Sequence, residues 1–109
     1  MKLIQHYQSA SGSEPFRDWI EKLDPTSRVK ILTYIKRIQL GAAKNNIKPV
    51  GQGVFELKID FGPGYRVYFA ETSKREIILL LLGGHKKSQD RDIRQAQLFW
   101  RHYGSQQKF

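Results

Sequence analysis

The sequence predicts a small α+β protein in which helices pack against one small sheet. Residues 54–60 and 65–70 alternate apolar and polar side chains as half-buried strands do. Residues 77–82 are apolar throughout, which is typical of a strand covered on both faces; a buried helix is the alternative, but six residues favour a strand. Residues 14–40 and 89–103 instead repeat apolar side chains at helical spacing. We expect one domain, residues 1–109, because this length suffices to bury a core.

Charge and composition narrow the classes of function. Nineteen Lys and Arg residues against ten Asp and Glu give a formal net charge of +9 and a sequence pI near 10. This imbalance attracts polyanions and is typical of nucleic-acid binders, although it is also compatible with simple solubility. The sequence has no cysteine, and no window approaches the roughly 18 apolar residues of a membrane span. We therefore expect a cytoplasmic protein without a membrane role.

The first quarter of the chain predicts a short strand and a helix. Residues 2–7 alternate weakly and are predicted to form a strand, followed by a polar loop. Ser13 is predicted to cap a helix that begins at Glu14-Pro15, because proline suits the first helical turn. One face of this helix is apolar and consists of Phe16, Trp19, Ile20 and Leu23.

A second helix completes a helical hairpin. Asp24-Pro25 ends the first helix and caps the second, which runs from Thr26 to Leu40 and stops at Gly41. Its other faces carry cations that are either a solvated surface or a ridge facing phosphate or a partner. The apolar positions at helical spacing are Val29, Ile31, Leu32, Ile35 and Ile38, and the cations include Arg28, Lys36 and Arg37.

The three strands are predicted to form an antiparallel meander with a cationic face. Residues 45–53 form a loop that places Lys48 beside the first strand. Lys58 and Arg66 lie on the polar faces of neighbouring strands, opposite the apolar faces. The third strand ends at Leu82 and delivers His85, Lys86 and Lys87 from its carboxyl end.

A C-terminal helix is predicted to cover this sheet. Ser88 is a candidate cap, and an apolar stripe follows at helical spacing. Residues 104–109 are expected to fray. The stripe consists of Ile93, Ala96, Phe99 or Trp100, and Tyr103, and Arg91 and Arg94 add positive charge to the helix.

The cations predict an anion site and not a metal site. The sequence lacks the phosphate loop, the nucleophile elbow and the zinc helix, and its three histidines lack a metal-like spacing. We expect no metal and no cofactor. Four cations from separate strands would repel one another unless an anion such as phosphate lay among them; they are Lys58, Arg66, Lys86 and Lys87. The alternative is that Glu56 and Asp60 neutralise Lys58 and Arg66 as cross-strand pairs.

If the anion is RNA, cleavage needs no metal. The ribose 2′-hydroxyl attacks the adjacent phosphorus once it loses its proton, provided that cations meet the charge on the phosphoryl oxygens. Arg66 with Lys86 or Lys87 are the candidates for those cations, and Lys58 is the candidate base. His85 is one candidate acid, with Tyr65, Tyr68 and Tyr103 as alternatives. The candidate RNA-binding residues are Arg28, Lys36, Arg37, Lys48, Arg91 and Arg94.

Three phrases of the sequence resemble a known family. They are Phe55-Glu56-Leu57-Lys58-Ile59, Gly64-Tyr65-Arg66-Val67-Tyr68-Phe69, and Leu81-Leu82-Gly83-Gly84-His85-Lys86-Lys87-Ser88-Gln89 followed by Asp92, Ile93 and Ala96. With the predicted order of elements, they resemble the RelE/ParE superfamily of bacterial toxins, and most closely its phage-derived Gp49-like or HigB-like addiction-module killer proteins.

The resemblance implies a RelE-like fold and the toxin of a type II toxin–antitoxin pair. Many such toxins cleave mRNA on the ribosome with basic residues of the sheet, which map to Lys58, Arg66, Lys86 and Lys87. The implied partners are mRNA on the ribosome and a cognate antitoxin. The antitoxin is expected to be a helix-turn-helix protein, and the toxin is expected to contact operator DNA only through it.

Two departures from the family pattern leave other activities open. RelE-type nucleases often carry a Tyr shortly after the last strand, where this chain reads Ser88-Gln89-Asp90, and relatives commonly show Asp in place of His85. The alternatives are a ParE-like toxin that inhibits DNA gyrase without cleaving RNA, and a basic nucleic-acid-binding module.

Overall fold

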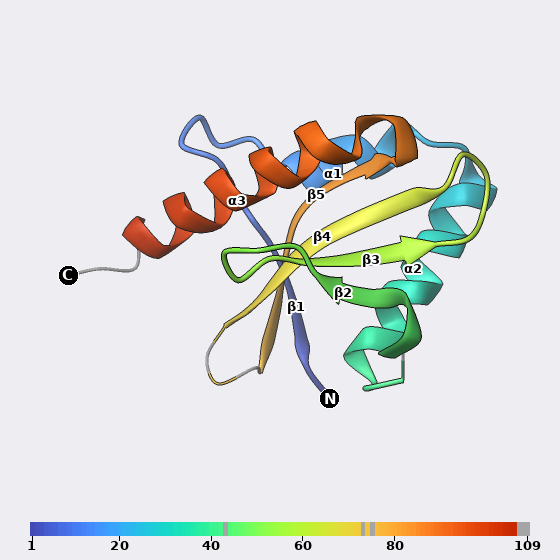
Figure 1. Ribbon diagram of the computed structural model, residues 1–109, viewed down its shortest axis with the longest axis horizontal. Coiled ribbons are helices and arrows are strands. Elements are labelled where there is room, and N and C mark those ends of the chain that lie inside the picture. The colour runs from blue at the N-terminus through green and yellow to red at the C-terminus, as the bar shows by residue number, and fades with distance from the viewer. Residues whose placement is uncertain (43, 73, 75, 107–109) are drawn as a thin grey trace.

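A computed structural model describes residues 1–42, 44–72, 74 and 76–106, and it contains one five-stranded sheet with three helices. The strand order is β1-β5-β4-β3-β2 (Figure 1). The elements are β1 (Leu3–His6), α1 (Pro15–Glu21), α2 (Pro25–Gln39), the 3₁₀ turn η1 (Lys44–Asn46), β2 (Ile47–Pro49), β3 (Phe55–Ile59), β4 (Tyr65–Thr72), β5 (Ile77–His85), the 3₁₀ turn η2 (Lys86–Ser88) and α3 (Gln89–Gln106).

The predicted meander is confirmed, and the sheet extends beyond it on both sides. β3, β4 and β5 pair antiparallel in sequence order, and β1 adds to β5 in parallel. The prediction of a loop over residues 45–53 is wrong in part, because Ile47–Pro49 forms the edge strand β2 against β3. Three residues are too few to show an alternating pattern, and Pro49 is tolerated because an edge strand leaves one side unpaired.

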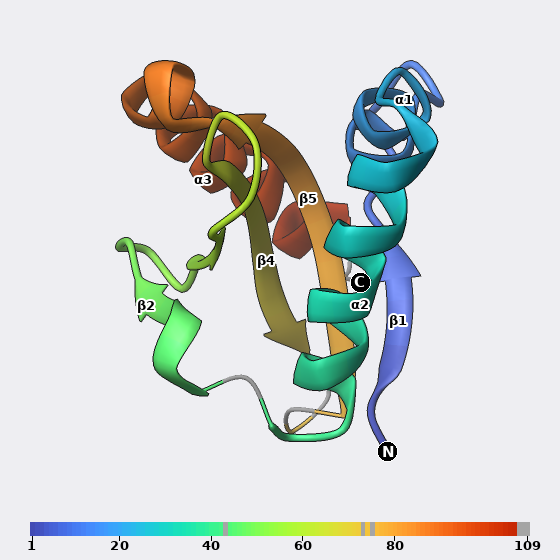
Figure 2. The ribbon, with the colours of Figure 1, turned by 90° about the vertical axis from the view of Figure 1, so that its right-hand side faces the viewer.

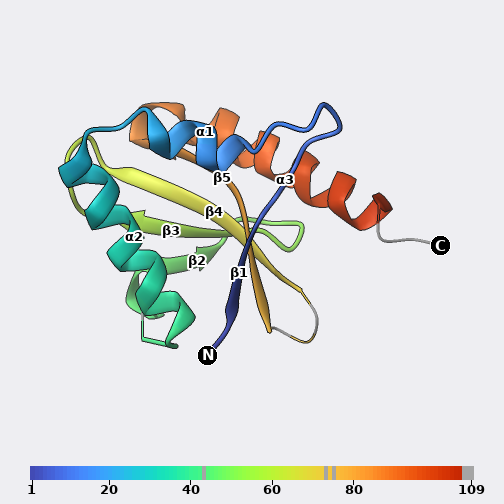
Figure 3. The same ribbon diagram turned by 180° about the vertical axis from the view of Figure 1, so that it is seen from behind.

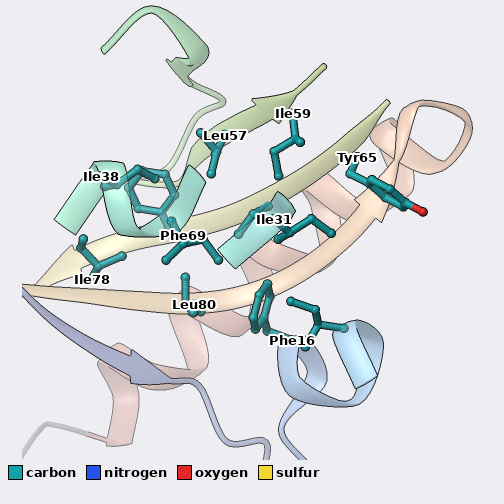
Figure 4. Packing of buried hydrophobic residues seen from close by; sticks show 12 residues of the cluster. Phe16, Ile31, Ile38, Leu57, Ile59, Tyr65, Phe69, Ile78 and Leu80 are labelled. Atoms are coloured by element: carbon teal, nitrogen blue, oxygen red, sulfur yellow. The ribbon is translucent and has the colours of Figure 1, made fainter. Parts of the chain in front are cut away.

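Helices cover both faces of the sheet. α1 and α2 lie on one face and α3 on the other, as the views from the side (Figure 2) and from behind (Figure 3) show. The core under α1 and α2 consists mainly of apolar side chains, beside which the buried Ser27 of α2 accepts a hydrogen bond from the Tyr65 hydroxyl, and it is seen from close by in Figure 4. Its twelve buried residues are Phe16, Ile20, Ile31, Ile35, Ile38, Leu57, Ile59, Tyr65, Val67, Phe69, Ile78 and Leu80.

A smaller core lies under α3. It consists of Tyr7, Val54, Tyr68, Ala70, Leu79, Leu81 and Ala96. The predicted stripe of α3 is confirmed, since Ala96 is fully buried and Ile93, Phe99, Trp100 and Tyr103 pack against this core.

β5 is longer than predicted and contains a bulge. Tyr68 pairs with Leu82 and Phe69 pairs with Leu80, so Leu81 is an extra residue on β5. Residues 77–82 show no period of two because both faces of the strand are buried: Ile78 and Leu80 belong to the core under α1 and α2, and Leu79 and Leu81 to the core under α3. The strand continues through Gly83 and Gly84 to His85, so the prediction that it ends at Leu82 is wrong.

The glycine pair in β5 permits close approach from both sides. A Cβ at Gly83 would lie 2.1 Å from the Trp19 ring of α1, and one at Gly84 would lie 1.9 Å from an Asp92 carboxylate oxygen of α3. Only glycine leaves room for these contacts, which explains why a strand interior tolerates it here.

The helix ends agree in part with the prediction. Asp24 caps α2 by accepting a hydrogen bond from the Ser27 backbone N–H, 3.0 Å away, and Gly41 follows α2 with a φ of 81°. Glu14 is the N-cap of α1, so the prediction that Ser13 caps this helix is wrong; the Ser13 hydroxyl bonds that of Ser9 at 2.7 Å.

At the other end of the chain, α3 continues further than predicted. Ser88 ends η2 immediately before α3. The helix extends to Gln106, past the predicted fraying at 104, and residues 107–109 lie outside the described part of the chain. No helix of the described residues is long and apolar enough to span a membrane.

Candidate functional site

Lys58 and Arg66 stand directly opposite each other on β3 and β4, as the sequence predicts. Arg66 in turn pairs with Gly84 of β5, so this row of the sheet ends beneath the start of α3. The prediction of half-buried strands is wrong for two charged residues of the polar face. Arg66 is only 6% exposed and Glu56 only 1%, because the first turn of α3 lies over this end of the sheet.

The Arg66 guanidinium is held by neighbouring groups. Its Nη1 donates a hydrogen bond of 2.6 Å to the Gly64 carbonyl oxygen, and its Nε lies 3.9 Å from Oε2 of Glu56. Gly64 has a φ of 78°, and a Cβ there would lie 3.1 Å from Nη1 and 3.6 Å from the Lys86 Cβ. Arg66 is therefore fixed beside the chain segment that carries Lys86.

Glu56 is a buried carboxylate surrounded by donors. Gln89 Nε2 donates a hydrogen bond to its Oε2 at 2.7 Å, and Lys48 Nζ lies 3.7 Å from its Oε1. The alternative that a cross-strand carboxylate accompanies Arg66 is thus correct, and the partner is Glu56, as that alternative named. No pattern in the sequence indicates that Gln89 bonds Glu56.

Lys58 also has a carboxylate nearby. Its Nζ lies 3.6 Å from Oδ1 of Asp60, and both side chains are more than half exposed. An exposed pair of this kind contributes about 0–1 kcal/mol, because water screens both charges. The expectation of unaccompanied cations is therefore wrong for Lys58 and Arg66, but Lys58 stays accessible to a ligand.

Two of the tyrosines considered as acids are buried. The Tyr68 hydroxyl is enclosed, and burial together with the Glu56 carboxylate raises the pKa of Tyr68 far above its ordinary value. The Tyr65 hydroxyl donates a hydrogen bond to the Ser27 hydroxyl on the α2 side, 3.2 Å away. Neither Tyr65 nor Tyr68 can reach a ligand in this arrangement. Tyr103 stacks on Trp100 at a ring distance of 5.6 Å.

We define the sheet hollow as the depression of about 420 Å³ beside β2, β3 and β4. It brings together three of the predicted cations, Lys48, Lys58 and Arg66, with the carboxylates of Glu56 and Asp60. The remaining lining residues are Asn45, Asn46, Ile47 and Gln89.

We define the helix-start hollow as the depression of about 480 Å³ around η2 and the first turns of α3. Five of the predicted site residues line it, together with Ser88, Gln89 and Asp90; they are His85, Lys86, Lys87, Arg91 and Arg94. Lys86 and Lys87 are exposed and have no carboxylate within 4 Å in the described ranges.

Gln89 lines both hollows and so joins them into one cationic surface. Asp92 is a buried residue of α3 that stabilises this junction through Ser88. The Ser88 hydroxyl donates a hydrogen bond to the Asp92 carboxylate. The Ser88 Oγ also lies 3.2 Å from the His85 carbonyl oxygen. These contacts hold η2, and with it Lys86 and Lys87, against β5. The signal that could have revealed Asp92 is Gly84, whose missing side chain makes room for that carboxylate.

The structure does not bring all predicted RNA-binding residues together. Lys48 joins the sheet hollow, and Arg91 and Arg94 join the helix-start hollow. Arg28, Lys36 and Arg37 belong to α2, on the opposite face of the sheet (Figure 2).

The arrangement suits an extended polyanion better than a metal ion. In residues 1–42, 44–72, 74 and 76–106, no cluster of three or more His, Cys, Asp or Glu side chains could hold a metal. Lysine and arginine side chains spread over two adjoining hollows instead offer several contacts for consecutive phosphates.

The fold defines a class of protein, that of the RelE-like fold. The chain is similar to a chain of the intact E. coli RelBE toxin–antitoxin complex, with a TM-score of 0.61, 13% identity and coverage of 78% of this chain and 96% of that one. It is also similar to an arginine-to-alanine double variant of E. coli toxin RelE in the free state, with a TM-score of 0.62, 12% identity and coverage of 89% and 94%.

The sequence comparisons identify the family. The family described as "Phage derived protein Gp49-like" matches residues 18–98, so the chain belongs to the phage-derived Gp49-like family. It is also 43% identical over 90 residues to an uncharacterized protein of Haemophilus influenzae, covering 82% of this chain and 89% of that protein. The predicted resemblance and the predicted RelE-like fold are both confirmed.

Proposed function

We propose that the protein is the toxin of a type II toxin–antitoxin pair and that it cleaves mRNA at the ribosome without a metal ion. The observation that carries this proposal is the cationic surface on the α3 side, where the sheet hollow and the helix-start hollow adjoin at Gln89. The RelE-like fold and the Gp49-like family support the same assignment.

The proposed reaction is transesterification within the RNA strand. The ribose 2′-hydroxyl gives its proton to a base, and its oxygen forms a bond to the adjacent phosphorus. The bond from phosphorus to the 5′ oxygen breaks, and an acid protonates that leaving oxygen. The products are a 2′,3′-cyclic phosphate and a 5′-hydroxyl end. Negative charge rises on the phosphoryl oxygens, so fixed cations accelerate the step.

The structure refines which residues take which role. Lys86 and Lys87 are exposed and free of described carboxylates, which suits them to the phosphoryl oxygens. Lys58 lines the sheet hollow and remains the candidate base, and His85, half-buried at the end of β5, remains the candidate acid. Arg66 is buried and tied to Gly64 and Glu56, so we assign it to shaping the site and to its local positive potential.

A cognate antitoxin is the proposed partner. The RelBE likeness concerns a toxin bound to its antitoxin and supports this assignment. We further propose that the antitoxin is a helix-turn-helix protein that carries the pair to operator DNA.

The test is induced expression with mapping of RNA 5′ ends. Growth should stop, and new ends should appear inside translated frames. In the Lys86→Ala/Lys87→Ala variant, cleavage should fall by about 100-fold or more, the loss typical of removing fixed charge stabilisation. Both side chains are exposed, so the variant should retain its fold.

A matched control removes the same charge from the opposite face. Lys36→Ala/Arg37→Ala takes two exposed cations from α2, and cleavage should stay within about threefold of the parent, because ordinary surface substitutions act weakly. If Lys86→Ala/Lys87→Ala cleaves like the parent, the assigned site is wrong.

One observation favours a second function, inhibition of DNA gyrase. Lys58 and Arg66 each have a carboxylate within 4 Å, which leaves less free positive charge in the sheet hollow for an RNA phosphate. A gyrase inhibitor would stop growth with intact message and altered supercoiling, so the same expression experiment separates the two functions.

A further inference from the structure

The helix α2 has two apolar stripes, of which the core uses only one. Ile31, Ile35 and Ile38 are buried against the sheet. Val29 and Leu32 are 65% and 51% exposed, so the prediction that they share the inward apolar face is wrong. At 100° per residue they lie on the outward half of the helix, in line with Leu40, which is 58% exposed at the end of the helix. The outward stripe therefore has no partner in the described residues.

A hollow adjoins this stripe at its N-terminal end. It has a volume of about 540 Å³ and mainly apolar walls, made by Pro25, Thr26, Val29, Lys30, Thr33 and Phe61. The Lys30 ammonium lies 5.7 Å from the centre of the Phe61 ring and thus at the rim of the hollow. A stripe and a hollow together can accept the large apolar side chains of a partner.

Cations flank the stripe on both sides. The three flanking cations are, at helical spacing, Arg28 on one side and Lys30 and Arg37 on the other; a fourth, the exposed Lys36, falls within the stripe between Leu32 and Leu40. Within the described ranges none of the three has a carboxylate within 4 Å, and the sequence contains no Asp or Glu between Asp24 and Glu56. A partner that covers aliphatic side chains here must also meet several unpaired positive charges.

This combination selects among occupants. A second copy of the chain would place cations against cations across a two-fold axis, which is repulsive. RNA would set hydrated phosphates and sugars against Val29 and Leu32, which cannot replace the hydrogen bonds that those groups make to water. A helix with an apolar stripe and acidic flanks complements both the aliphatic side chains and the charge.

We propose that the outward face of α2 binds an acidic amphipathic helix of the partner protein. That this partner is the antitoxin rests on the proposed function. The stripe from Val29 to Leu40 extends about 16 Å, which corresponds to three turns of a bound helix. The surface lies across the sheet from the two hollows, so binding here anchors the partner without itself occupying the cationic surface.

The test measures the affinity of this chain for the partner protein, with both full-length chains purified. The partner used is the protein encoded in the reading frame next to that of this chain, where the antitoxin of such a pair is expected. Val29→Glu/Leu32→Glu should raise the dissociation constant by about 100-fold, because two apolar contacts are lost and like charges face the acidic flanks. Binding of the parent should weaken as salt rises, because salt screens exposed charges.

A matched control lies on the other side of the sheet. Leu98 of α3 is 51% exposed, the same fraction as Leu32, and Leu98→Glu should leave the dissociation constant within about threefold. Equal affinity of the parent and the Val29→Glu/Leu32→Glu variant would overturn the proposal, as would equal losses in that variant and in Leu98→Glu.

A second measurement does not depend on a folded variant. A photo-crosslinking residue at position 32 of the otherwise unchanged chain should attach to an acidic, helical segment of the partner. Attachment to RNA, to a second copy of the chain or to anionic phosphatidylglycerol vesicles in place of the partner would overturn the proposal, and so would the absence of any partner crosslink in the purified complex.

Growth separates failure of this inference from failure of the proposed function. Val29→Glu/Leu32→Glu should still arrest growth, since it leaves both hollows intact, but co-expressed partner should no longer restore growth. If the parent never arrests growth, the proposed function fails, while the dissociation constants still decide whether α2 binds the partner.

Discussion

The two faces of the sheet are covered by helices, but they are stabilised differently. Under α1 and α2 the sheet presents apolar side chains such as Leu57, Val67 and Phe69, all essentially inaccessible to water. Under α3 the same strands present Glu56 and Arg66, which are almost equally buried. Neighbouring residues of one strand therefore serve packing on one side and electrostatics on the other.

This difference teaches where function can be placed on a small domain. Apolar packing is the main interaction on the α1/α2 face, and it involves the inward side of α2, so the outward surface of this helix is free to carry a docking stripe. The α3 face encloses charges whose burial is costly unless they are paired and hydrogen-bonded. We infer that such charges are retained because they shape the cationic surface beside them.

The largest stability effect is expected on the apolar face. Phe69→Ala should lower the free energy of unfolding by about 3–5 kcal/mol, because a buried ring leaves a cavity. Phe55 stacks on Phe69 at a ring distance of 5.7 Å but is only partly buried, so Phe55→Ala should cost less. Urea unfolding of both variants measures the difference. Equal costs would show that the margin of this core is packed as tightly as its centre.

The next effect concerns the buried pair on the α3 face. Arg66→Ala should lower the free energy of unfolding by about 3 kcal/mol, because it leaves the Glu56 carboxylate buried without its nearest guanidinium. The double variant Glu56→Gln/Arg66→Met should unfold with nearly the parent free energy, since it removes both charges. Urea unfolding of the full cycle tests this, and an additive cycle would show that the two groups do not interact.

Sequence patterns predict the apolar face better than the charged one. The alternation of residues 54–60 and 65–70 identifies β3 and β4 and which of their residues face a core. It does not reveal that α3 buries the polar side as well, because a helix far along the chain supplies the cover. The bulge at Leu81 is likewise hidden in a uniform apolar run, and β2 is too short for a pattern.

For the candidate site, the sequence predicts the cations but not their surroundings. Lys58 and Arg66 are opposite each other because strand register follows from alternation and pairing. The roles of Gln89 and Asp92 depend on how α3 crosses the sheet, which no local spacing encodes. In the sequence, the cations of α2 look the same as those of the two hollows. They lie on the opposite face of the sheet because of how α2 packs, which their charge does not reveal.

Gly83 and Gly84 of β5 allow the two faces to be compared at adjacent residues, because Gly83 faces α1 and Gly84 faces α3. Gly83→Ala should cost about 2–3 kcal/mol of unfolding free energy, because the new methyl group meets the Trp19 ring at three atoms within 2.5 Å. Gly84→Ala should cost only about 1 kcal/mol, since the Asp92 carboxylate can rotate away. If the protein is a nuclease, Gly84→Ala should nevertheless reduce cleavage more, because Asp92 and Ser88 hold η2. The measurements are urea unfolding and RNA cleavage of both variants. The prediction is contradicted if the variant that loses more stability also loses more cleavage.

The smallest effect is a pH dependence of stability at the end of β1. His6 lies against Phe16 on the α1 side at a ring distance of 5.7 Å, whereas Tyr7 stacks on Phe99 of α3. Burial, assisted by the Arg17 charge, lowers the pKa of His6, and its Nδ1 is enclosed without a hydrogen-bond partner in the described residues. The charged imidazole is thus less favoured in the folded than in the unfolded protein.

The contribution of His6 to the pH dependence of the free energy of unfolding has a definite sign. Above the unfolded pKa of about 6.5 the group is neutral in both states and its effect is absent. As pH falls below that value the unfolded state binds the proton first, so stability declines. Urea unfolding between pH 7 and pH 5 should show this decline in the parent, a smaller decline in His6→Asn, and an intermediate one in Arg17→Gln, which removes only the second cause of the lowered pKa. An unchanged decline in His6→Asn would assign the pH dependence to titratable groups other than His6.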